Sequence, residues 1–107
     1  MNVWVVTGDE GEYDDYHEWT DSIYTTEQAA VERWKELWTD QIIPDTNRKD
    51  GFRWKHRHIT TYTVEKWSTD DPKAEAEEVD VTAARREITE PLKTRRQQRV
   101  ERMREQQ

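Results

Sequence analysis

The chain has 107 residues, with 24 Asp and Glu against 17 Lys and Arg, and a formal net charge of −7. This length allows one domain, or one small domain with an appendage, and the absence of cysteine excludes disulfides and Cys-ligated zinc. The acidic balance disfavours binding to nucleic acid or to an anionic membrane surface.

The aromatic residues divide the chain into two parts. The six Trp, four Tyr and one Phe all lie at or before Trp67, so the side chains that fill a small core are confined to residues 1–67. Residues 1–71 also hold 16 of the 24 acids and only 8 of the 17 Lys and Arg. We therefore expect a compact domain over residues 1–67, a linker or short helix over 68–80, and a charged helical tail over 81–107.

The first two predicted elements are strands. Residues 3–7, Val-Trp-Val-Val-Thr, are β-branched or aromatic on both faces, which is typical of a central strand covered on both sides or nearly so. Residues 8–15 follow as a turn or hairpin loop with two glycines and five acids. Residues 16–24 form the second predicted strand, so the chain is expected to begin with a β-hairpin.

A helix is predicted after this hairpin. Thr25 is the expected N-cap, and Gln28 three residues later completes a capping box. The next apolar residues fall on one arc of a helix at about 100° per residue, and they are Ala30, Val31, Trp34, Leu37 and Trp38. Pro44 ends the predicted helix, and residues 45–51 form a polar loop.

Residues 52–67 are predicted as a third strand region, with Phe52, Trp54, His56 and His58 on one face. A right-handed crossover through the helix places this strand beside the first one, on its free side. The predicted fold class is α+β, with a three-stranded antiparallel sheet of order 2-1-3, one packed helix and a C-terminal helical extension.

The extension has a pattern that changes along its length. Residues 73–107 are rich in helix-forming Ala, Glu, Arg and Gln, and Pro91 interrupts or restarts the helix. Three apolar residues lie on one line of a helical projection and three arginines continue it: Ala84, Ile88 and Leu92, then Arg95, Arg99 and Arg102. The first half can pack on the domain or on another copy, whereas the second half must project or meet an acidic surface.

Three segments together resemble a family of small uncharacterised bacteriophage proteins. They are Val-Val-Thr at 5–7, Gly-Glu-Tyr-Asp-Asp-Tyr-His at 11–17 and Tyr-Thr-Thr-Glu-Gln-Ala at 24–29. The resemblance covers residues 3–38 and extends to a closing strand at Tyr62-Thr63-Val64. It implies a β-β-α-β core and a phage or prophage origin, and it implies no catalytic residues. Asp14 stands where Ser is usual, and the loop at 39–51 and the tail are additions in which a specific function is expected.

The acidic loop is the first candidate site, and it comprises Asp9, Glu10, Glu12, Asp14 and Asp15. These carboxylates can offer a negative patch to a basic protein surface. The alternatives are a solvated turn or a Ca²⁺ site, although the order of ligands is not that of an EF-hand.

The tail is the second candidate site, through Arg95, Arg96, Arg99 and Arg102. These side chains can bind a partner protein or the phosphates of a nucleic acid, but no interleaved aromatic residues are present for base stacking. The alternative is a solvated helix end, where cations are favoured by the helix dipole.

Catalytic and metal-binding motifs are weak or absent in the sequence. His56 and His58 have a spacing that occurs in zinc sites, but a third ligand would have to come from His17 or a carboxylate. Ser22 and Ser68 lie in no nucleophile elbow, and the three glycines form no phosphate-binding loop. We predict no catalytic residues, no metal and no cofactor.

These features favour a non-enzymatic accessory protein of phage type, which binds and modulates a host or defence protein in the bacterial cytosol. The tail helix would extend the contact or form a homodimer. Two alternatives remain, a nucleic-acid-associated protein that contacts phosphates through the tail arginines, and a small metal-dependent enzyme. The first residues do not form a signal peptide and no apolar run approaches the ~20 residues of a membrane span, so we expect a cytoplasmic location without membrane contact.

Overall fold

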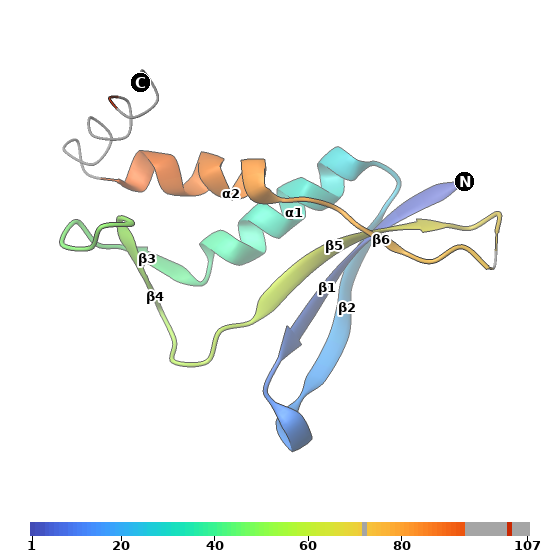
Figure 1. Cartoon of the computed structure of the whole chain (residues 1–107), viewed down its shortest axis with the longest axis horizontal. Coiled ribbons are helices and arrows are strands. Elements are labelled where there is room, and N and C mark those ends of the chain that lie inside the picture. Colours follow the sequence, from blue (N-terminus) through green and yellow to red (C-terminus); the bar gives the residue numbers. More distant parts are fainter. Residues whose placement is uncertain (72, 94–102, 104–107) are drawn as a thin grey trace.

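The structure, a computed structural model, describes residues 1–71, 73–93 and 103. Its main sheet has four antiparallel strands in the order β2-β1-β5-β6, namely β2 (His17–Tyr24), β1 (Asn2–Glu10), β5 (Thr61–Ser68) and β6 (Glu77–Glu78). The two helices, α1 (Glu27–Thr39) and α2 (Thr82–Thr89), lie on the same side of the long strands (Figure 1). A separate hairpin pairs β3 (Ile42–Pro44) with β4 (Phe52–Trp54). No helix in the described part of the chain has the length and apolar character needed to cross a membrane.

The α+β class and the antiparallel arrangement of the first, second and third long strands are confirmed, with β1 between β2 and β5. The prediction of three strands is wrong, because β6 adds a fourth strand beside β5. Glu77 and Glu78 pair with Lys66 and Glu65, and the Val79 amide donates to the Val64 carbonyl at 2.8 Å. A strand of two residues has no periodicity that a sequence pattern can reveal.

The predicted strand over residues 52–67 is two strands separated by a loop. β4 pairs with β3 and is not part of the main sheet. The chain joins the main sheet only at Thr61, where β5 begins. Gln41, just after α1, fixes this loop through its side chain, which donates to the Thr60 carbonyl at 2.9 Å and accepts from the Thr60 amide at 2.8 Å. The polar run from Lys55 to His58 is exposed and belongs to neither strand.

The helix begins close to its predicted start but ends earlier than predicted. Its N-cap is Thr26 rather than Thr25, because the Thr26 hydroxyl accepts from the Ala29 amide at 3.2 Å. The helix ends at Thr39, so Pro44 is not its terminator. Pro44 instead lies in the short strand β3.

The core lies between α1 and one face of the sheet. Val6 of β1 and Val64 of β5 are fully buried beneath Ala30 and Trp34 of α1. The Trp34 indole N–H donates to the carbonyl of Tyr62 at 2.9 Å, which ties the helix to β5. The apolar arc predicted for the helix therefore packs on the sheet.

A cluster of aromatic rings joins α1 to the β3–β4 hairpin. Trp38 stacks on Trp34 with a centroid separation of 6.1 Å. It also meets the edges of Phe52 and Trp54 at 5.4 and 5.5 Å. Edge-to-face and offset-stacked pairs of this kind add to the stabilisation that burial provides.

The segment after Trp67 completes this core. Ala84 of α2 is buried, and four further apolar residues of the segment pack against the core, namely Val79, Val81, Ile88 and Leu92. The Arg85 guanidinium lies 5.5 Å from the centroid of the Trp38 ring, a cation–π contact. Lys35 of α1 forms an ion pair with Glu87 of α2. The apolar line Ala84, Ile88 and Leu92 thus packs on the same chain.

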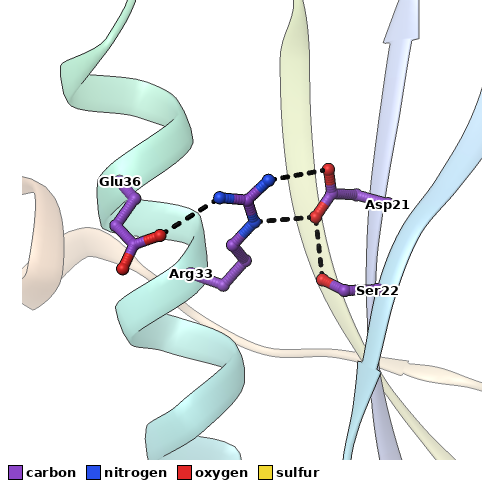
Figure 2. A network of polar contacts seen from close by, with 4 residues as sticks. All are labelled: Asp21, Ser22, Arg33 and Glu36. Carbon is purple, nitrogen blue, oxygen red and sulfur yellow. Dashed lines mark hydrogen bonds and ion pairs between the residues drawn. The ribbon is translucent and has the colours of Figure 1, made fainter.

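The outer strand β2 contains a β-bulge. Val6 pairs with Ser22 and Thr7 with Thr20, so Asp21 has no direct partner on β1. The Asp21 carboxylate accepts from Arg33 Nε at 2.9 Å and Nη2 at 3.3 Å, and from the Ser22 hydroxyl at 2.8 Å. Arg33 Nη1 also donates to Glu36 at 3.1 Å, as Figure 2 shows. This network attaches the edge of the sheet to α1.

Candidate functional site

The five predicted loop acids occupy two kinds of position. β1 continues to Glu10, so the prediction of a loop over residues 8–15 is wrong for its first part. Asp9 lies in the sheet, opposite Glu18 on one side and Thr61 on the other. Glu12, Asp14 and Asp15 lie in the short connection to β2 and are exposed. The β1–β2 pairing extends to Glu10 and His17, which confines the connection to residues 11–16.

The connection is tight. Gly11 has φ +90°, and a Cβ placed there would lie 2.3 Å from the Asp15 carbonyl oxygen, so only glycine fits. The Asp15 amide donates to the Glu12 carbonyl at 3.1 Å within the single turn of 3-10 helix η1 (Tyr13–Asp15). Tyr13 has φ +55° and is 94% exposed. The geometry presents the acids and the phenol rings of Tyr13 and Tyr16 to solvent.

No ion pair from the described residues reaches Glu12, Asp14 or Asp15. Elsewhere on the surface carboxylates are paired, as in Asp21 with Arg33 and Glu32 with Lys35. The end of the β1–β2 hairpin therefore keeps a negative charge that the described part of the chain does not neutralise.

The base of this hairpin end is held by aromatic stacking. The His17 ring stacks on Trp19 at 5.3 Å, and Trp19 meets the edge of Tyr62 at 6.5 Å. Trp19 lies across Gly8, where a Cβ would approach its indole ring to 2.7 Å. His17 Nε2 also lies 3.4 Å from a Glu10 carboxylate oxygen. These contacts order the strands directly beneath the exposed acids.

A surface hollow of about 680 Å³ lies between the hairpin end and the β4–β5 loop. Its lining residues are Glu10, Gly11, Glu12, Asp15, His17, Arg57, His58 and Ile59. The lining contains carboxylates, imidazoles and a guanidinium, but it contains no hydroxyl or thiol that could act as a nucleophile. This composition suits the binding of polar and charged groups.

The predicted His56/His58 strand face is wrong, because both residues lie in the loop between β4 and β5. His58 lines the hollow together with His17, and His56 does not. Within the described residues, no group of three or more His, Cys, Asp or Glu side chains is arranged to hold a metal ion.

The sheet face opposite α1 is a second surface, which we call the open face. Pairing places twelve strand residues on it: Val3, Val5, Thr7, Asp9, Glu18, Thr20, Ile23, Thr61, Thr63, Glu65, Trp67 and Glu78. Neither helix covers this face. The first strand was predicted to be covered on both sides or nearly so, and among the described residues Val3 and Val5 remain partly exposed on the open face.

Sequence reasoning missed the acids of the open face. Glu18, Glu65 and Glu78 alternate with residues of the covered face, and that alternation is the signal that could have placed them. The alternation was hidden in β2 by the bulge at Asp21, which shifts the pattern by one residue. The tail candidates Arg95, Arg96, Arg99 and Arg102 lie outside the described residues.

Comparisons with known proteins give this chain no family, since no family model, no curated protein and no solved structure matches it.

Proposed function

We propose that this chain is a non-enzymatic binding protein whose acidic hairpin end engages a basic surface on another protein. The observation that carries the proposal is the set of exposed carboxylates at the hairpin end, Glu12, Asp14 and Asp15, which no described basic residue pairs. Carboxylates held in this way attract and orient a partner of opposite charge, and they increase the rate of association.

The resemblance to small phage proteins supports a proposal for where the chain acts and on what kind of partner. The partner would be a host or defence protein in the bacterial cytosol, and binding would modulate its activity. The exposed ring of Tyr13, among the acids, would add contact area, since tyrosine is favoured at protein interfaces.

The test uses the full chain immobilised as bait in a nuclease-treated bacterial lysate. We expect the wild-type chain to recover a basic protein, and we expect recovery to fall as salt is raised. The triple variant Glu12→Gln, Asp14→Asn and Asp15→Asn should lose most of that protein. If the triple variant recovers it as well as the wild type, the hairpin end is not the binding surface.

The matched control removes three acids from other exposed positions, Glu27→Gln, Asp50→Asn and Glu75→Gln. This control changes the net charge by the same amount, so it separates a local effect from a general one. Recovery by the control should equal that of the wild type. Nuclease treatment excludes partners that arrive through nucleic acid, which is the outcome expected if the tail arginines bind phosphates.

A further inference from the structure

The open face of the sheet combines an apolar patch with acids, and none of its twelve strand residues is Lys or Arg. The patch lies at the start of β1, where Val3 pairs with Trp67 and Val5 with Ile23. Ile23 is 62% exposed and Trp67 is 44% exposed. Contiguous apolar side chains of this size on a surface mark an interaction site.

The charges on the open face are arranged as two like-charged pairs across neighbouring strands. Asp9 stands directly opposite Glu18, and Glu65 stands directly opposite Glu78. Like charges directly opposite one another destabilise a sheet. On the covered face of the same β5–β6 pair, Lys66 stands opposite Glu77, which is the stabilising arrangement. The open face thus holds acids at positions where they repel one another in the free protein, although the Glu18 carboxylate also accepts from the Tyr16 hydroxyl at 3.2 Å.

We infer that the open face binds a partner protein that is apolar at its centre and carries Lys or Arg side chains at its rim. This inference rests on the proposed function and names a larger surface for it. A basic side chain placed between Asp9 and Glu18, or between Glu65 and Glu78, removes the repulsion that the free protein tolerates.

The negative charge of the open face also disfavours binding of a second copy of the chain, of nucleic acid or of anionic lipid. A second copy, packed face to face, would bring the four carboxylates of one sheet toward the four of the other. Nucleic acid and anionic lipid are repelled for the same reason. A basic protein surface is the occupant that satisfies both the acids and the apolar patch.

The open face is continuous with the acidic hairpin end through the Asp9–Glu18 pair. Strand spacing and rise give three strands of this length a footprint on the order of 400 Å². A standard interface buries roughly 800 Å² on each partner. A partner that covers the open face therefore also reaches the hairpin end to complete an interface of ordinary size.

The test follows amide shifts of the ¹⁵N-labelled full chain by NMR as a probe peptide is added. The probe is a helical peptide of leucine and lysine with one apolar and one basic face. We expect shifts on β1, β2 and β5 and at the Trp67 indole. The variant Trp67→Thr should weaken binding about tenfold, as loss of an aromatic anchor does. Met103→Thr is the matched control and should leave affinity unchanged, because Met103 is an exposed apolar residue that belongs neither to the open face nor to the hollow at the hairpin end.

A second arm measures stability and binding in the same variant. Glu18→Gln combined with Glu65→Gln removes both like-charged pairs, so the thermal midpoint of the free chain should rise. The same variant should bind the probe more weakly and with a smaller dependence on salt. A midpoint that falls would show that these acids stabilise the free fold, and it would overturn the inference.

Further outcomes would also overturn it. One is a probe response confined to the hairpin end, and another is equal binding of a peptide in which glutamate replaces lysine. A third is a concentration-dependent dimer in sedimentation that Trp67→Thr abolishes, because a second copy would then be the occupant.

The two proposals can fail separately. The inference fails alone if the hairpin triple variant loses the lysate partner while Trp67→Thr affects neither the probe nor that partner. The proposed function fails alone if the probe maps to the open face but the wild-type chain recovers no basic protein.

Discussion

Arg33 donates to two carboxylates, Asp21 at the edge of the sheet and Glu36 on α1, and Asp21 is the more buried of the two. The Asp21 carboxylate is 16% exposed, whereas the Arg33 side chain is 37% exposed. Hydrogen bonds from Arg33 hold the pKa of Asp21 below its usual range, and they raise the pKa of Arg33. The bulge makes this possible, because it leaves Asp21 without a partner on β1 and available to α1.

Replacing Asp21 with Asn tests this network. We expect the variant to lose about 1–2 kcal/mol of unfolding free energy at neutral pH, less than for a fully buried pair because Arg33 is partly solvated. A depressed carboxyl pKa contributes stability above the unfolded pKa, and this contribution is lost as pH falls through the folded value. The difference between wild type and variant should therefore shrink below about pH 4.

Denaturant unfolding at a series of pH values provides the measurement. Asp14→Asn is the control, since Asp14 is exposed and pairs with no described residue, and it should unfold like the wild type at every pH. A gap between Asp21→Asn and wild type that stays constant down to pH 3 would contradict the assignment of the pKa shift.

Among the elements, the β3–β4 hairpin and the end of α2 are in direct contact. Gly51 has φ +82°, and a Cβ at this position would lie 2.1 Å from the carbonyl oxygen of Leu92. Leu92 closes the 3-10 turn η2 (Glu90–Leu92) that follows α2. The β-turn between β3 and β4 and the C-terminal segment are thus packed backbone against backbone.

The substitution Gly51→Ala should separate these two segments. A left-handed backbone angle disfavours alanine, and the methyl group also has no room, so we expect a loss of more than about 1 kcal/mol. Limited trypsin digestion should cut faster at Arg85 and Arg86 in the variant than in the wild type. Lys49→Ala, in the same turn and exposed, should leave both stability and digestion unchanged.

Sequence patterns predicted the elements whose apolar residues repeat regularly. The capping residues placed the start of α1 to within a residue or two, the arc that includes Trp34 and Trp38 identified its packed face, and the β-branched run placed β1 between two strands of the sheet. The patterns failed where contacts between distant parts of the chain determine where a strand begins or ends. Gln41 determines where β5 begins by bonding to Thr60, nineteen positions away in the chain. The sequence predicted the candidate acids at 9–15 as a single loop, whereas only the pairing partners show that Asp9 and Glu10 belong to the sheet.

For the whole molecule, the core is shared between residues before and after Trp67. Trp38 is covered on one side by Phe52 and Trp54 and approached by Arg85 on another. Asp80 accepts from both the amide and the hydroxyl of Thr82, at 2.9 and 2.6 Å, and so orders the turn that leads into α2. These bonds lower the pKa of Asp80. The segment after Trp67 therefore folds as part of the same core as the residues before it.

Truncation tests this sharing. A chain that stops after Trp67 loses β6 and α2 and exposes the outer side of Trp38, so we expect it to lose on the order of 3 kcal/mol or more. A domain of this size has little stability to spare, and its thermal transition should broaden and move to lower temperature. A chain that stops after Lys93 is the comparison, and it should melt like the full chain. Equal midpoints for both truncations would show that the first part folds without help.

The position of Trp67 gives this molecule a built-in optical probe. All six tryptophans are among the described residues, and Trp67 is the one on the exposed surface. Its indole lies on the open face beside Val3, whereas Trp34 and Trp38 are buried in the core. A soluble quencher should therefore reach Trp67 before the others. A protein that covers the open face would protect this one emission component, so occupancy of the face can be followed in the unlabelled chain.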